Sequence, residues 1–115
     1  MTLSLLAGIA LLASPSANAG TLTGGSFTSE TVLSHSTDHY VIPFVGGEYA
    51  RIALSGDGDT DLDIRVYDES GNLIKESLST GDDEIVGWVP AWTGRYLVEV
   101  SNLGDVYNNY VLVTN

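Results

Sequence analysis

The sequence predicts an all-β protein built as an antiparallel β-sandwich of about eight strands. Val, Ile, Leu and Tyr recur in short runs in which apolar and polar residues alternate. Gly, Asp, Asn and Pro interrupt these runs about every eight to twelve residues, which is the spacing of strands and turns in a sandwich. No segment sustains the apolar period of a helix. These three observations together favour two packed sheets over a helical fold.

Each predicted strand is a short run whose side chains reverse direction at every step. The clearest run is 61–67, in which Leu62, Ile64 and Val66 point to one face. The residues between them, Asp63 included, point to the other face, so we expect one face in the core and one in water. In chain order the predicted strands are Phe27–Ser34, His39–Phe44, Tyr49–Ser55, Asp61–Tyr67, Asn72–Ser77, Glu84–Val89, Arg95–Ser101 and Tyr110–Thr114.

The connections between these runs contain residues that form turns. Asp68–Asn72 supplies a hairpin loop with a glycine able to take positive φ, and Gly46-Gly47 supplies a second turn. Pro43 and Pro90 fall at strand ends or on edge strands, where a missing amide donor costs little. The sequence shows no internal repeat and no linker that would divide the chain into two domains.

The N-terminal residues predict export from the cytoplasm. An apolar run between Leu3 and Ala13 is followed by Ala17-Asn18-Ala19. This is typical of a secretory signal peptide, and the run is shorter than the roughly 20 residues that cross a bilayer. We therefore expect residues 1–19 to be removed, leaving a single domain at 20–115 that is secreted or periplasmic and has no stable membrane span after processing.

Composition limits the partners of this domain. The chain has 115 residues, 15 of them acidic and four basic, so its formal net charge is −11. This charge repels phosphate backbones and anionic lipid surfaces, which argues against nucleic acid and membranes as partners. Because the chain has no cysteine, disulfides, thiolate metal sites and cysteine nucleophiles are excluded.

Two of the predicted strands carry a resemblance to a known family. Residues 55–68 read SGDGDTDLDIRVYD, similar to the S-G-x-G-D-x-D-L-x-φ-x-V-Y-D strand (φ, apolar) of the bacterial pre-peptidase C-terminal domain. Residues 94–100 read GRYLVEV, similar to its later G-x-Y-x-V-x-V strand. The resemblance spans residues 40–115. It implies a jelly-roll-like sandwich of the kind appended to secreted peptidases, with relatives that include the collagen-binding domains of bacterial collagenases and that bind collagen, other insoluble polymers or calcium.

Carboxylates gather in and beside one loop of the predicted sandwich. Calcium takes about six to eight oxygen ligands, several of them carboxylates. One interpretation is a calcium ion shared by two neighbouring loops, and the other is a solvated turn whose Asp and Gly residues serve backbone geometry and solubility. The candidate metal ligands are Asp57, Asp59, Asp61, Asp63, Asp82, Asp83 and Glu84.

The acidic run does not match the known calcium motifs. It fits a helix-loop-helix calcium loop only superficially, because Leu62 stands where that loop needs glycine and the flanks read as strands. A Gly-x-Gly-x-Asp repeat occurs once, whereas a parallel β-helix needs it in series.

No set of catalytic residues is evident. His35 and His39 lie four residues apart, but the Glu of a zinc-protease helix is missing and the context is a turn between strands. Neighbouring Ser and Asp residues in such a turn rarely reach the geometry of a catalytic triad. Asp61 and Asp63 have little room for the sugar cleft of a glycosidase in a domain of this size. We therefore expect a protein that is not an enzyme.

Aromatic residues are the other candidates for binding. Trp88 and Tyr96 alternate with aliphatic residues and are expected in the core, whereas Trp92 and Tyr107 lie beside loops and are expected to be exposed. Exposed Trp and Tyr bind sugars or extended protein chains well, because each joins a large apolar surface to a polar tip. Trp92 and Tyr107 are therefore the candidate ligand-binding residues.

Two function classes follow from these observations. The first is an exported, non-catalytic binding or adhesion module for an extracellular polymer or protein, stabilised by calcium if the acidic loop binds it; this hypothesis predicts an exposed Trp92 or a tyrosine-bearing face. The second is a structural or chaperone-like accessory domain that acts on a separately encoded secreted peptidase. It predicts a contiguous apolar patch or an open sheet edge. The sequence makes no prediction about the oligomeric state.

Overall fold

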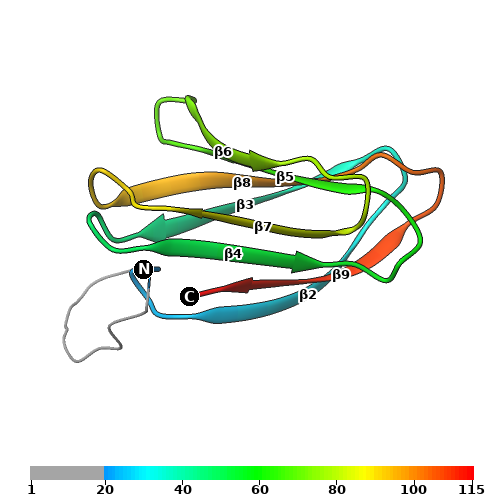
Figure 1. The fold of residues 1–115 in the computed structure, drawn as a ribbon, viewed down its shortest axis with the longest axis horizontal. Helices are drawn as coiled ribbons and strands as arrows, with labels where there is room; N and C mark the ends of the chain where they lie inside the picture. Colours follow the sequence, from blue (N-terminus) through cyan, green and yellow to red (C-terminus); the bar gives the residue numbers. More distant parts are fainter. Residues whose placement is uncertain (1–19) are drawn as a thin grey trace.

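The structure, a computed structural model, describes residues 20–115. All eight predicted strands are present, and each end lies within two residues of its predicted position (Figure 1). The predicted signal peptide at 1–19 lies outside the described residues. Within residues 20–115, no helix has the length and apolar character that a membrane crossing requires. The strands are β2 (Ser26–Val32), β3 (Thr37–Phe44), β4 (Ala50–Ser55), β5 (Leu62–Tyr67), β6 (Leu73–Ser77), β7 (Asp83–Trp88), β8 (Gly94–Asn102) and β9 (Asn108–Thr114).

The strands form two four-stranded antiparallel sheets, with the orders β2-β9-β4-β7 and β3-β8-β5-β6. The antiparallel pairs are nested around the β5–β6 hairpin: β4 pairs with β7, β3 with β8, and β2 with β9. This is a long hairpin rolled up so that its two arms alternate between the sheets, which makes the fold a jelly-roll β-sandwich as expected.

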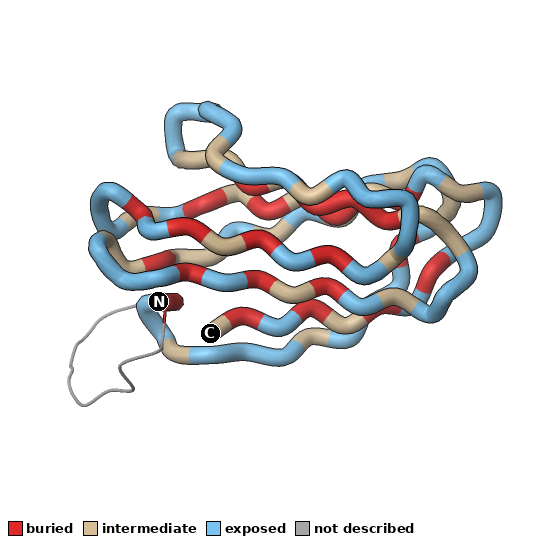
Figure 2. The backbone as a smooth tube through the Cα atoms, in the orientation of Figure 1, coloured by how far each residue is buried: buried red, intermediate tan, exposed pale blue. Residues whose placement is uncertain are grey.

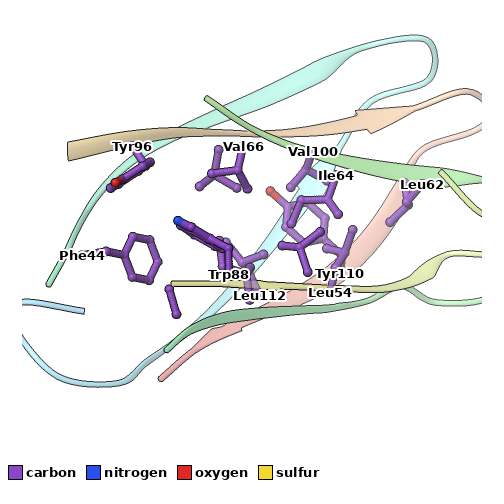
Figure 3. Close-up of a cluster of buried hydrophobic side chains, with 14 of the residues drawn as sticks. Phe44, Leu54, Leu62, Ile64, Val66, Trp88, Tyr96, Val100, Tyr110 and Leu112 are labelled. Atoms are coloured by element: carbon purple, nitrogen blue, oxygen red, sulfur yellow. The ribbon is translucent and has the colours of Figure 1, made fainter. Parts of the chain in front are cut away.

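The core lies between the sheets and follows the predicted alternation of side chains. Buried and exposed residues alternate along the strands (Figure 2), and Leu62, Ile64 and Val66 are fully buried. Trp88 and Tyr96 are buried as predicted and pack edge-to-face with Phe44, with ring centroids 4.9–5.9 Å apart (Figure 3). This aromatic cluster fills one end of the core, and aliphatic side chains together with Tyr110 fill the rest.

The predicted turn chemistry is also confirmed. Gly47 and Gly71 have φ values of 82° and 86°, a region that is costly for any residue with a Cβ atom. Pro43 lies in β3, an edge strand of its sheet, so its missing amide leaves no ladder bond unmade.

One expectation about exposure is wrong. Asp63 points to the outer face of its sheet, as the alternation predicts, but only 5% of it is exposed. Its strand, β5, is an inner strand of its sheet, and Asp63 lies opposite Ser101 of β8. Its Oδ1 atom has no hydrogen-bond partner among the described residues. Burial and the nearby Asp61 carboxylate raise the pKa of Asp63.

Candidate functional site

The outer face of the β3-β8-β5-β6 sheet carries an apolar row that crosses all four strands. Val41 lies opposite Leu97, Leu97 opposite Tyr67, and Tyr67 opposite Leu73. We call these four residues the cleft row. Val41 is 65% exposed and Leu73 48% exposed, so the row is open to solvent at both edges of the sheet.

A shallow cleft of about 660 Å³ opens over this row. Val41, Leu97 and Tyr67 contribute to its apolar lining. The β5–β6 hairpin loop supplies one wall, and this hairpin projects from the body of the sandwich (Figure 1). An open cleft with an apolar floor and a few polar groups at its rim is the usual form of a binding site.

The rim of the cleft carries charges of both signs. The Glu69 side chain accepts a hydrogen bond from the Arg95 backbone N–H at 3.3 Å, and its second oxygen lies 3.7 Å from Arg95 Nε. On the same face, His39 Nε2 lies 3.2 Å from Glu99 Oε2. These groups can pair with polar or charged groups of a bound chain while its apolar parts lie on the floor.

The loop that forms the wall is held by Asp68. Asn72 donates its backbone N–H to Asp68 Oδ1 at 2.9 Å and its side-chain amide to Oδ2 at 3.1 Å, and Ser70 N–H also donates to Oδ1 at 2.9 Å. These hydrogen bonds, those from Asn72 above all, lower the pKa of Asp68. The wall is therefore a preformed turn rather than an open loop.

Beside the cleft row, the next row of the sheet is charged. His39 lies opposite Glu99, Glu99 opposite Arg65, and Arg65 opposite Glu76. We call these four residues the charged row. Their signs alternate when His39 is protonated, and Arg65 Nε lies 3.2 Å from Glu76 Oε1. The charged row gives one long side of the cleft a polar border.

The acidic loop lies at the far end of the sandwich from the hairpin wall and forms turns. The Asp57 carboxylate accepts the backbone N–H of Asp59 at 3.1 Å and of Asn109 at 2.8 Å. Asp82 Oδ2 accepts the Gly58 N–H and, at 3.0 Å, the side-chain amide of Asn108. These contacts match the interpretation in which the loop carboxylates serve backbone geometry.

Asn108 is the residue around which this loop is organised. It is fully buried. Its Oδ1 accepts the Asp57 backbone N–H at 3.0 Å, and its side-chain N–H groups donate to Thr60 Oγ1 and to Asp82, both at 3.0 Å. The sequence offered little sign of this role, because a buried asparagine at the start of a strand looks the same as an exposed one.

The remaining candidate metal ligands do not converge. Asp83 accepts a hydrogen bond from the Ser55 hydroxyl at 3.0 Å, and the buried Glu84 accepts bonds from Ser77 and Ser79. Across residues 20–115, no three His, Asp or Glu side chains lie close enough together to hold a metal ion. The side-chain arrangement therefore does not fit a calcium site, and calcium binding stays a prediction from the sequence.

Trp92 and Tyr107 are both exposed, at 63% and 54%, but the structure does not bring them together. Trp92 precedes β8 and Tyr107 follows it, so the length of that strand separates them. Trp92 lies beside Gly94, close to Glu69 and so near the rim of the cleft. Tyr107 lies at the opposite end, near the acidic loop. One compact ligand cannot contact both.

The two histidines have separate acidic partners. His35 Nε2 lies 2.7 Å from Asp105 Oδ1, whereas His39 is paired with Glu99. His35 has a positive φ of 51°, which marks the turn between β2 and β3. The two histidines therefore make separate surface contacts, each with an acidic residue on a different segment.

Sequence reasoning missed the cleft. The signal was present, because Val41, Tyr67 and Leu97 are apolar residues at positions that alternate with the core residues of their strands. What the sequence does not reveal is that these three positions come from non-adjacent segments and fall in register in one sheet.

The fold is shared with solved structures of low sequence identity. The pre-peptidase C-terminal domain of a collagenase from Bacillus anthracis is 16% identical over 77% of this chain and 88% of its own, with a TM-score of 0.62. A mitogen from Yersinia pseudotuberculosis is 13% identical over 80% of this chain and 85% of its own, with a TM-score of 0.63. A periplasmic inhibitor of g-type lysozyme from Aeromonas hydrophila is 12% identical over 90% of this chain and 91% of its own, with a TM-score of 0.60.

The likeness to the collagenase domain confirms the fold that the two strand motifs implied. At these identities the likeness concerns the fold alone. No protein-family model matches the sequence, and no curated protein matches it.

Proposed function

We propose, from this shared fold, that the protein is an exported, non-catalytic binding module whose cleft holds an extended segment of an extracellular polymer or protein. The observation that carries the proposal is the cleft: an apolar floor of Val41, Leu97 and Tyr67 beneath a rim of paired charges. An extended chain fits such a floor better than a compact metabolite does, because the row crosses the whole sheet and is open at both edges.

The comparisons support this proposal in two ways. One similar structure is the pre-peptidase C-terminal domain of a collagenase, and another is a periplasmic inhibitor of g-type lysozyme. A binding role outside the cytoplasm also agrees with the predicted signal peptide. Trp92, beside the rim, would extend the cleft at its hairpin end.

The test is co-sedimentation of the purified protein with insoluble fibrillar collagen, chitin, cellulose and peptidoglycan. We expect one of these to retain the protein, and Tyr67→Ala to weaken that retention at least about tenfold, the scale of an aromatic hot spot. Tyr107→Ala is the control, since it removes an exposed tyrosine at the opposite end of the sandwich, and we expect little change.

Two results would contradict the proposal. If none of the polymers retains the protein, the proposed binding function is wrong. Loss of binding in Tyr107→Ala but not in Tyr67→Ala would move the site to the loops beside the acidic turn.

An accessory role on a separately encoded peptidase is the second candidate. The feature that favours it is an apolar row on the other outer face of the sandwich, where Phe27 is 71% and Ile85 58% exposed. If a peptidase docks there, Ile85→Glu abolishes its association with this protein and Tyr67→Ala does not. The reverse pattern supports the cleft.

A further inference from the structure

The outer face of the β2-β9-β4-β7 sheet carries a second apolar row. Phe27 lies opposite Val113, Val113 opposite Ala53, and Ala53 opposite Ile85, so the row crosses all four strands in register. Phe27 is the most exposed large hydrophobic side chain in residues 20–115. We call these four residues the second apolar row.

The surroundings of this row are nearly free of charge in a strongly acidic protein. Among the side chains of the four strands that point outward here, only Arg51 and Asp83 are charged. The other outward residues are Phe27, Ser29, Thr31, Ala53, Ser55, Ile85, Gly87, Asn109, Val111 and Val113. Because the net charge of −11 makes copies of this chain repel each other, a face with so few charges lowers the cost of bringing two copies together.

The two charged residues lie on opposite sides of the row. Arg51 is two positions before Ala53 on β4, and Asp83 is two positions before Ile85 on the antiparallel strand β7. Within residues 20–115 Arg51 forms no ion pair, although its chain neighbours are fixed in the sheet. Among the described residues, Asp83 accepts a hydrogen bond from the Ser55 hydroxyl at its Oδ1 atom, which leaves its second carboxylate oxygen able to accept more.

From this geometry we infer that the second apolar row is the interface of a symmetric homodimer. A two-fold axis along the row lays each strand over the same strand of the second copy, running in the opposite direction. The row then packs on itself, and Arg51 of each copy faces Ser55 of the other, with Asp83 one strand away at a spacing of about 4.8 Å. A single patch thus supplies both the apolar contact and the two reciprocal ion pairs.

A second copy fits this face better than an unrelated partner does. An isologous interface needs the same patch to be complementary to itself, which places opposite charges on opposite sides of the axis. Arg51 and Asp83 meet that requirement, and the apolar residues between them lie on the axis. Sheets that pack face to face lie about 10 Å apart, within reach of a long arginine side chain.

This dimer would leave both clefts accessible. The second apolar row and the cleft row lie on opposite outer faces of the sandwich, so two paired copies hold their clefts on the two outermost surfaces. The pair would then be bivalent, and binding to a repetitive polymer would gain avidity without a new contact. The inference itself stands on the second apolar row and does not depend on what occupies the cleft.

Charge reversal tests this dimer by analytical ultracentrifugation. We expect the purified wild-type protein to sediment as a dimer at about 100 μM, and Arg51→Asp or Asp83→Arg alone to weaken association at least about tenfold, because each sets like charges against each other across the axis. The double variant Arg51→Asp/Asp83→Arg restores both pairs with their signs exchanged. We expect its dissociation constant to return to within about threefold of the wild type.

Apolar substitutions complete the experiment. Ile85→Glu, on edge strand β7, should abolish the dimer, whereas Val41→Glu, equally exposed on edge strand β3, should leave it intact. Circular dichroism confirms that each variant is folded. A monomeric wild type at every concentration, a double variant no tighter than the single ones, or a dimer that survives Ile85→Glu would each overturn the inference.

Discussion

The two outer faces of the sandwich each carry an apolar row of four residues, but different side chains border the two rows. The cleft row runs beside the charged row and beneath a projecting hairpin loop, and the Glu69–Arg95 ion pair and Glu99 contribute to the lining of its cleft. The second apolar row is bordered by hydroxyl, glycine and amide residues, with one charge on each side. One face carries a cleft, and the other carries a nearly uncharged apolar row with one charge on each side.

This difference teaches that exposed apolar area does not by itself define a function. What surrounds the area decides which partner fits it. Ion pairs around a concave row can be exchanged for contacts with a polar chain, whereas a nearly uncharged apolar row favours another apolar surface. The same β-sandwich can therefore bind a ligand with one sheet and a second copy with the other.

The largest effects on ligand binding and on dimerisation should come from replacing an apolar residue in the middle of each row with glutamate. Leu97→Glu should weaken binding of a soluble polymer fragment at least about tenfold and leave the sedimentation of the protein unchanged. Ala53→Glu should do the reverse, with a loss of dimer and unchanged binding of the fragment. The two variants are matched, since each places glutamate on an inner strand of its sheet.

The measurements are fragment binding by calorimetry and mass by ultracentrifugation, on variants whose melting temperature shows that they are folded. If either variant loses both properties, the two faces are coupled and the division of roles fails.

The next largest effect should come from Asp63, which lies on the sheet face that carries the cleft and affects the free energy of unfolding. Its raised pKa means that the folded chain holds this proton more tightly than the unfolded chain does. The stability from this group is present at low pH and is lost as the pH rises through the raised pKa. Asp63→Asn removes the buried charge, and we expect a gain of about 1 kcal/mol at pH 7, which raises Tm by about 4–8 °C.

The control for Asp63 is Asp59→Asn, an exposed position where the change should stay within about 0.5 kcal/mol. Melting curves at pH 7 and pH 3 make the comparison. At pH 3 the wild-type carboxyl is protonated, so the advantage of Asn should shrink. An equal gain at both pH values would show that desolvation of the charge is not the cause.

The sequence predicted the architecture well because local sequence patterns determine the strands and turns of a β-sandwich. Alternation placed Leu62, Ile64 and Val66 in the core, and glycine positions marked the turns at Gly47 and Gly71. Burial of Asp63 could not be predicted, because it depends on the order of strands in the sheet. Local alternation assigns a side chain to one face of a sheet. It does not show whether other segments of the protein cover that face.

The functional surfaces were harder to predict for the same reason. Each apolar row joins one residue from each of four strands, and the register between strands is a tertiary property. The exposure of Trp92 and Tyr107 followed from their place beside loops, but their separation followed from the topology. Exposed aromatics were therefore found from the sequence, whereas the cleft was not.

A smaller effect on Tm is expected from the charged row, which lies beside the cleft row. Glu99 lies between His39 and Arg65, so Glu99→Gln removes the shared carboxylate while keeping the shape of the side chain. Exposed ion pairs contribute about 0.2–1 kcal/mol, and we expect a fall in Tm of about 2–4 °C at low salt. The difference from wild type should disappear at about 1 M NaCl, where such charges are screened. A salt-independent loss would assign the effect to packing instead.

Calcium should have the smallest effect on Tm. Asp57 and Asp82 already accept backbone and amide N–H groups, and these donors compete with an ion for the two carboxylates. We therefore expect Tm in about 1 mM calcium to stay within about 1 °C of its value in chelator, with magnesium as the control.

A site with a dissociation constant of about 10 μM would instead add roughly 2.7 kcal/mol at that concentration and raise Tm by several degrees. A rise with calcium alone, abolished by Asp59→Asn and Asp61→Asn, would contradict the expectation and establish the loop as a metal site. The acidic loop lies at the end of the sandwich away from the hairpin wall, so such a result would add a metal site there and leave the contrast between the two faces intact.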